Sequence, residues 1–181
     1  MSEPADALKD ESALVRKARW GDHDAFAQLY QAHAKAIHAL AYHLTGNAAA
    51  AEDITQDTFL KMLGFLSGLR GDAPLRPWLK RVAANAAIDR LRREQRFTGE
   101  VEESSWSDSG AVEPSENSEI MGLLQRLPPL ARTLVWLHEM EGWSHPELAE
   151  RFKRSQSWSK SIVSRALAKL REDIETGIRN D

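Results

Sequence analysis

The sequence predicts an all-α protein of two small helical domains joined by a flexible acidic linker, with a helix-turn-helix in the C-terminal domain. Apolar residues recur every three or four positions through most of the chain, and no stretch alternates for long enough to form a strand. Between the two helical regions, residues 97–117 are rich in Ser, Glu, Gly and Pro and cannot bury enough apolar surface to offset their ordering entropy. The predicted domains are therefore residues 1–96 and 118–181, with the linker at 97–117.

Three helices are predicted at the start of the N-terminal domain. The first runs from Ser12 to Trp20 and is closed by Gly21, and Asp22 caps the second. The run Thr45-Gly46-Asn47 ends the second helix and starts the third.

A fourth helix is predicted to begin near Trp78, after a Gly- and Pro-rich loop at 68–77. Its apolar residues Trp78, Val82, Ala86 and Leu91 can face a core. Such a helix could lie against a phosphate backbone, and Asn85 offers both a donor and an acceptor to a base edge. The alternative is a solvated helix end whose late arginines complement the helix dipole. The side chains that would then face outward are Lys80, Arg81, Asn85, Arg92 and Arg93.

In the C-terminal domain, helices at Ser118–Arg126 and Pro128–Glu141 are predicted to precede a helix-turn-helix. Ser144 is the expected N-cap of its first helix, with Glu147 at capping-box spacing and Pro146 in the first turn.

The second helix of this motif follows a polar turn at 153–157 and carries a basic exposed face. No acidic residue occurs between Arg151 and Arg171. Two helices at this spacing, the second of them cationic, suit the major groove of DNA.

The formal net charge of −3 conceals a segregation of charge along the chain. Residues 76–96 contain seven basic and two acidic side chains, whereas residues 100–119 contain seven acidic and no basic ones. Two basic blocks separated by an acidic one indicate two nucleic-acid contacts joined by a spacer.

An acidic and polar cluster precedes apolar residues in the third predicted helix. Carboxylates around apolar anchors suit docking on a basic protein partner, although acids at a helix start also complement the helix dipole. The cluster consists of Glu52, Asp53, Gln56 and Asp57, followed by Phe59, Leu60 and Met62.

Nothing in the sequence predicts a catalytic residue, a metal site or a cofactor. The chain has no cysteine, and its histidines lack the spacing of a zinc-peptidase signature. No apolar run approaches the ~20 residues that a membrane span needs, and the N-terminal residues lack a signal-peptide pattern. We therefore expect a cytoplasmic protein that is not an enzyme and does not insert into a membrane.

Four segments of the chain resemble, in order and spacing, bacterial sigma-70-type sigma factors of the extracytoplasmic-function (ECF) group. The segments are GDHDAFAQLYQAH, AEDITQDTFLKML, RPWLKRVAANAAIDRLRR and LPPLARTLVWLHEMEGWSHPELAE. The resemblance covers nearly the whole chain and implies an RNA polymerase sigma factor that keeps only the second and fourth conserved regions. It also implies three partners, namely core RNA polymerase (its β′ clamp helices and β subunit), promoter DNA and an anti-sigma factor.

The resemblance implies three sets of contact residues. The segment AEDITQDTFLKML would bind the β′ clamp helices through Glu52, Asp53, Gln56, Asp57, Phe59 and Leu60. The region 71–93 would recognise the promoter −10 element and help to melt it through Arg76, Trp78, Lys80, Arg81, Asn85, Arg92 and Arg93. The second helix of the helix-turn-helix would read the −35 element through Ser157, Lys160, Ser161, Ser164 and Arg165.

The chain departs from the family pattern inside the helix-turn-helix. Lys153 stands in the turn where the family usually has glycine, Ser159 replaces an expected apolar residue, and Ile162 stands where a base is common. Either the second helix is rotated or Trp158 fills the gap.

Two other functions explain part of the sequence. A regulator that binds operator DNA without core polymerase accounts for the helix-turn-helix but leaves the acidic cluster and the first basic helix without a role. A sigma-like decoy that holds a regulator would fail to support transcription from any promoter.

Overall fold

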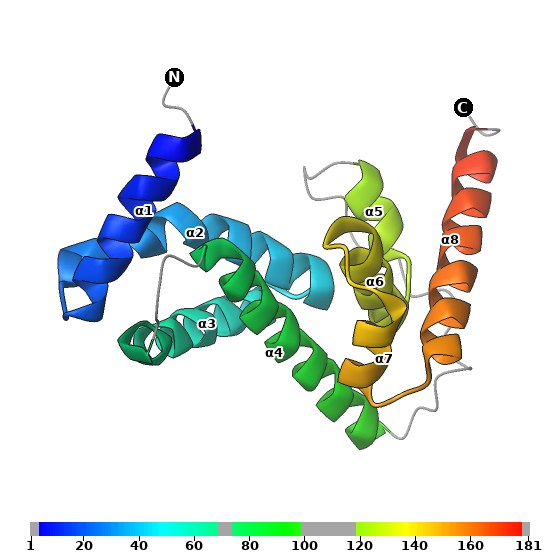
Figure 1. The fold of residues 1–181 in the computed structure, drawn as a ribbon. Coiled ribbons are helices and arrows are strands. Elements are labelled where there is room, and N and C mark those ends of the chain that lie inside the picture. Colours follow the sequence, from blue (N-terminus) through cyan, green and yellow to red (C-terminus); the bar gives the residue numbers. More distant parts are fainter. Residues whose placement is uncertain (1–3, 69–73, 99–118, 179–181) are drawn as a thin grey trace. The chain divides into compact units, whose positions relative to one another are not determined.

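The computed structural model describes residues 4–68, 74–98 and 119–178, and within these ranges the chain forms helices with short connections and no strand (Figure 1). The prediction of an all-α fold is thereby confirmed for these residues. The helix before the predicted linker continues to Thr98, and the rest of that linker lies outside the described residues.

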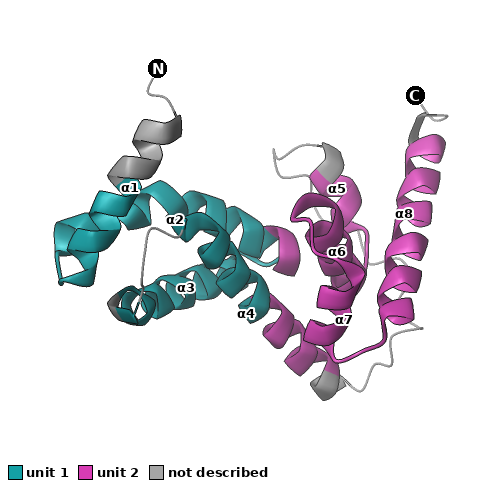
Figure 2. Cartoon of the chain, viewed as in Figure 1, with its two compact units in different colours: residues 1–42, 47–86 teal, residues 43–46, 87–181 magenta. Residues whose placement is uncertain are grey.

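The chain divides into two compact units (Figure 2). Unit 1 comprises residues 1–42 and 47–86, and unit 2 comprises residues 43–46 and 87–181. The division falls within two helices, near residue 43 and near residue 87, so the domain bounds 1–96 and 118–181 stay a prediction.

Unit 1 is built from α1 (Pro4–Arg19), most of α2 (His23–Thr45), α3 (Ala48–Gly68) and the first half of α4 (Leu75–Thr98). The predicted N-cap of α2 is confirmed, because the Asp22 carboxylate accepts a hydrogen bond from the Ala25 N–H at 2.9 Å. Asn47 caps α3 in the same way, through the Ala50 N–H at 2.8 Å.

A partly buried carboxylate contact joins three helices of unit 1. One Glu11 oxygen on α1 lies 2.9 Å from His33 Nε2 on α2, and the other accepts the backbone N–H of Leu75, the first residue of α4, at 3.2 Å. The N–H groups at a helix start have no partner within the helix, so Glu11 satisfies one of them. The surrounding core of unit 1 includes Leu29, Ile37, Met62, Leu66, Leu75 and Leu79.

The fourth helix differs from its prediction in two ways. It begins at Leu75 rather than near Trp78, since Pro77 falls in the first turn, where its missing N–H costs nothing. Its core face also differs, because Trp78, Val82, Ala86 and Leu91 are only partly buried. The residues that α4 buries instead are Leu75, Leu79, Ala83, Ala84, Ala87 and Ile88.

In the described part of unit 2, five helical segments follow α4. They are α5 (Glu119–Gln125), α6 (Pro129–Val135), the π-helical turn η1 (Trp136–Met140), α7 (His145–Phe152) and α8 (Gln156–Ile178). The helix predicted over 128–141 therefore changes from α to π geometry at Trp136. Helix α8 packs against α5, α6 and α7, and the buried side chains there include Leu134, Leu137, Leu148, Ile162, Val163 and Ala166.

The helix-turn-helix consists of α7, a short turn and α8. The predicted capping box is present, with the Glu147 N–H donating to Ser144 Oγ and the Ser144 N–H donating to the Glu147 carboxylate at 2.9 Å. At the other end of α7, Lys153 adopts the left-handed conformation, with φ 56° and ψ 46°. This turn satisfies the last carbonyls of α7, because the N–H groups of Lys153 and Arg154 donate back to Glu150 and Ala149.

We expect Lys153→Gly to raise the free energy of unfolding by about 0.5–1 kcal/mol. The left-handed conformation costs a residue with a Cβ roughly 1–2 kcal/mol, and the entropy that glycine adds to the unfolded chain takes back about half of that gain. Urea denaturation followed by circular dichroism measures the change.

The matched control is Lys169→Gly within α8, which should lower stability by about 1 kcal/mol, since glycine disfavours a helix interior. A loss of stability in both variants would show that the turn at Lys153 is not strained.

Candidate nucleic-acid and polymerase-binding surfaces

The five residues predicted to read the −35 element lie on one exposed face of α8. Their spacing of three and four positions places them in a stripe along the helix. The opposite side of the helix is buried, with Ile162, Val163 and Ala166 each at most 4% exposed. The stripe, here called the reading face, consists of Ser157, Lys160, Ser161, Ser164 and Arg165.

The departures from the family pattern are accommodated inside unit 2. Ser159 is fully buried, and its hydroxyl pairs with Nδ1 of His145 on α7 at 3.0 Å. Ile162 is part of the core, and the half-buried Trp158 ring tilts against Phe152 with ring centroids 5.5 Å apart. A hydrogen bond between α7 and α8 therefore compensates for the polar residue in an apolar position.

The acidic cluster forms an exposed face on α3, here called the docking face. Glu52, Asp53, Gln56 and Asp57 are exposed, and Leu60 at 64% exposure extends the face toward the helix end. These residues lie beyond the first helical turn, which contains no acid, so the helix dipole does not account for them.

Phe59 is the exception among the residues predicted to dock. It is 3% exposed and lies in the core of unit 1, where its ring packs against Tyr30 with ring centroids 4.6 Å apart. The structure therefore corrects the prediction, because Phe59 lies beneath the docking face and not on it. The sequence prediction also missed two exposed apolar side chains, Tyr30 and Leu63. Leu63 was detectable from its three-residue spacing after Leu60, whereas no pattern marked Tyr30.

The residues predicted for the −10 element are spread along α4. In unit 1, Arg76 and Arg81 are exposed, and Lys80, Trp78 and Asn85 are partly buried. One face of the Trp78 indole is covered, because it stacks on Phe65 with ring centroids 4.0 Å apart and an interplanar angle of 14°.

The last two predicted residues, Arg92 and Arg93, belong to the part of α4 that lies in unit 2. Both contact Asp89, Arg92 through a carboxylate oxygen at 3.7 Å and Arg93 through the backbone carbonyl at 3.3 Å. Arg151 of α7 also binds the Asp89 carboxylate at 2.9 Å. The positive charges of Arg92 and Arg93 are therefore partly compensated within unit 2.

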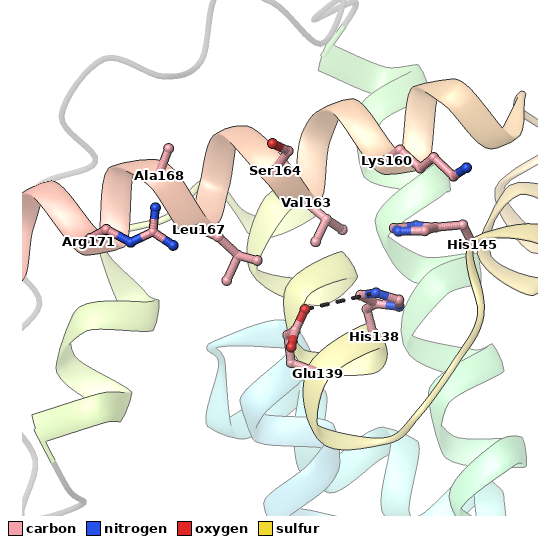
Figure 3. A pocket seen from close by; sticks show the side chains of 9 residues that line it. All are labelled: His138, Glu139, His145, Lys160, Val163, Ser164, Leu167, Ala168 and Arg171. Carbon is pink, nitrogen blue, oxygen red and sulfur yellow. Dashed lines mark ion pairs between the residues drawn. The ribbon is translucent and has the colours of Figure 1, made fainter.

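Two histidines stack beside the reading face (Figure 3). The rings of His138 on η1 and His145 at the start of α7 have centroids 4.2 Å apart and an interplanar angle of 27°. Burial lowers the pKa of His145, and the nearby His138 and Lys160 lower it further, whereas Glu139 raises it. Sequence reasoning assigned no role to this pair, since the two residues are seven apart and belong to different elements.

Among the described residues, no group of three or more His, Cys, Asp or Glu side chains is placed to hold a metal ion. In the same part of the chain, no helix is long and apolar enough to cross a membrane.

The comparisons with known proteins agree with this architecture. The family model for sigma-70 region 2 matches residues 29–97, and that for sigma-70 region 4 matches residues 117–170. The sigma factor NccH of Alcaligenes xylosoxydans xylosoxydans is 34% identical over 88% of this chain and 92% of its own length. The ECF sigma factor SigM of Mycobacterium tuberculosis H37Rv is 30% identical over 94% and 89%.

A solved structure has the same fold. CnrH in complex with the cytosolic domain of CnrY matches with a TM-score of 0.53 and 25% identity, over 92% of this chain and 98% of that one.

The two helical units, one with a helix-turn-helix, define a transcription protein that contacts DNA. The chain belongs to the sigma-70 family of RNA polymerase sigma factors, in its ECF group. It therefore acts with core RNA polymerase and promoter DNA in transcription initiation, as the resemblance in the sequence implied.

The histidine contacts predict a pH-dependent stability of unit 2. Burial also lowers the pKa of His43, with Glu141 acting in the opposite direction. Because the folded state disfavours both imidazolium ions, the unfolded chain binds more protons near pH 6. The free energy of unfolding should therefore be highest above about pH 6.5 and fall as the pH drops from there through the folded pKa values.

Urea midpoints between pH 7.5 and 5.5 measure this effect, and His145→Asn should flatten the decline. The control is His38→Asn, which changes an exposed histidine on α2 in unit 1. An equal effect of the two substitutions would mean that His145 is not the titrating group.

Proposed function

We propose that this sigma factor uses its three exposed faces for three separate contacts. The docking face of α3 binds the β′ clamp helices of core polymerase, the basic residues of α4 recognise and help to melt the −10 element, and the reading face of α8 reads the −35 element. The chain contributes binding and positioning without chemistry of its own, and it works in the cytoplasm.

The observation that carries the proposal is the reading face. Five polar or basic side chains are exposed along one stripe of α8 while the other side is buried. A helix of this kind presents donors and acceptors to base edges in the major groove and a cation to the phosphates. Arg165 is the residue suited to bidentate recognition of a guanine edge.

The role at the −10 element rests on α4. Flipping a base out of the duplex costs a few kcal/mol, which stacking and hydrogen bonds to the extruded base must offset. Arg76, Arg81 and Asn85 supply the polar contacts. Because Phe65 covers one face of the Trp78 indole, a base or a sugar could stack only on the other face.

The docking role rests on the composition of the α3 face. Exposed carboxylates precede the exposed Leu60 and Leu63 along α3, and apolar anchors next to polar side chains suit a protein interface. Phe59 supports this surface from beneath, and its ring contacts that of the exposed Tyr30.

An anti-sigma factor and the polymerase β subunit complete the proposed partners. One solved structure that resembles this chain contains CnrH in complex with the cytosolic domain of a second protein, CnrY. A binding protein that covers the same faces would keep this chain from core polymerase until a signal releases it.

A core polymerase pull-down followed by single-round transcription on a genomic promoter pool tests the proposal. Binding with discrete transcripts is the expected result and gives the promoter motif directly. Binding without transcripts would favour a decoy, and promoter binding without polymerase would favour an operator-binding regulator.

Replacing two acids of the docking face should weaken core binding. Asp53→Ala combined with Asp57→Ala removes two charges from the rim, and we expect affinity for core polymerase to fall about tenfold, or roughly 1.4 kcal/mol. Fluorescence anisotropy of the labelled chain with core polymerase measures the affinity.

The matched control is Glu172→Ala combined with Glu175→Ala, which removes the same charge from exposed positions on α8. Equal losses of core affinity in the two double variants would mean that net charge, and not the docking face, determines binding to core polymerase.

The role of Arg165 is separable from that of a simple phosphate contact. Arg165→Ala should cost about 1–3 kcal/mol on the cognate −35 sequence and much less on a mismatched one. Arg165→Lys keeps the charge but loses the bidentate geometry, so it should lose discrimination as well. If Arg165→Lys behaves like the parent chain on all sequences, Arg165 contacts only phosphate.

A further inference from the structure

A groove with a volume of about 450 Å³ adjoins the reading face (Figure 3). Two residues of the reading face, Lys160 and Ser164, line it on the α8 side. The stacked histidines and Glu139 form the facing wall, and Arg171 lines it further along α8. The imidazoles therefore lie beside the part of the reading face that Lys160 and Ser164 form.

The hydrogen bonds of the two rings fix which nitrogen is available. Nδ1 of His138 lies 2.7 Å from the carbonyl oxygen of Trp143, and because a carbonyl only accepts, this nitrogen carries a proton. Nδ1 of His145 is held by the Ser159 hydroxyl, which can donate or accept. The His145 contact is thus compatible with both protonation states of the ring and leaves Nε2 for another partner.

The charges around His145 oppose its protonation in the free chain. Lys160 and the stacked His138 face it with positive or potentially positive charge, and Arg171 lines the same groove. Glu139 is the opposing acid, and its carboxylate lies 3.9 Å from Nε2 of His138. A second anion entering the groove beside Lys160 would reverse this balance.

We propose that His145 is a proton-linked contact to the DNA backbone, in which its imidazolium and Lys160 together bind a phosphate of the −35 duplex. This inference rests on the proposed reading of the −35 element by α8. Phosphate contacts position a protein on DNA without reading sequence, so His145 would set affinity and register while the reading face sets specificity.

The sign of the pH dependence follows from linkage. A bound phosphate raises the pKa of His145 above its lowered value in the free chain, so binding takes up a proton. Promoter affinity should therefore rise as the pH falls toward the free pKa, and the gain should disappear as the pH rises through the pKa of the complex.

Promoter binding by holoenzyme tests the inference. The probe is a fluorescent promoter fragment with an intact −35 duplex, and the dissociation constant is measured at pH 7.5 and 6.0 at one ionic strength. The parent holoenzyme should bind about tenfold more tightly at pH 6.0, since uptake of one proton allows up to tenfold per pH unit.

Three variants separate His145 from other titrating groups. His145→Asn keeps a polar atom near Ser159 and should lose the pH effect, whereas His38→Asn should retain it. His145→Lys carries a permanent charge and should bind tightly at both pH values.

The failures of the two proposals are distinguishable. If His145→Asn retains the full pH effect while Arg165→Ala still loses discrimination, the inference about His145 is overturned and the reading of the −35 element stands. Inorganic phosphate added at constant ionic strength and pH 6.0 should compete with the DNA backbone and weaken binding by the parent more than by His145→Asn, and equal effects on the two would overturn the phosphate contact. Absence of promoter-specific binding by every holoenzyme would overturn both.

Discussion

The reading face of α8 depends on what the other side of the same helix buries. Ile162, Val163 and Ala166 pack toward α6 and α7, and this apolar seam fixes the rotation of α8 about its axis. The polar Ser159 lies within the seam and would cost free energy there without a partner. His145 supplies that partner, so the first residue of α7 helps to hold the helix that presents the reading face.

A single partly buried contact has a similar effect in unit 1. Glu11 is bound by His33 and by the first N–H of α4, so one carboxylate joins α1 and α2 to the start of the basic helix. This contact favours a helix that begins at Leu75, which in turn places Leu75 and Leu79 in the core and leaves Arg76 exposed. In both units a polar contact between helices determines which side chains remain for nucleic acid.

Features that depend on neighbours in the chain could be predicted from the sequence, and features that depend on distant partners could not. The capping box of α7 and the caps at Asp22 and Asn47 are local, and the structure contains all three. The start of α4 was missed because Glu11, its partner, lies 64 residues earlier. Phe59 was assigned to the surface together with its exposed neighbours in the segment, and its burial depends on residues outside α3, Tyr30 among them. The groove beside α8 combines three elements, and no sequence pattern spans them.

The small charge of the reading face explains why the protonation of one histidine would change DNA affinity by a measurable amount. Three of its five residues are serines, so Lys160 and Arg165 carry its entire formal charge. The electrostatic part of DNA affinity grows with the number of phosphates that a protein neutralises. An imidazolium at His145 would add a third positive charge to those of Lys160 and Arg165. This is a large fractional increase in the positive charge beside the DNA, in a chain whose net charge is −3. The same ring is held by Ser159 in either state, so protonation changes the charge beside the DNA without requiring the loss of the contact that orients α8.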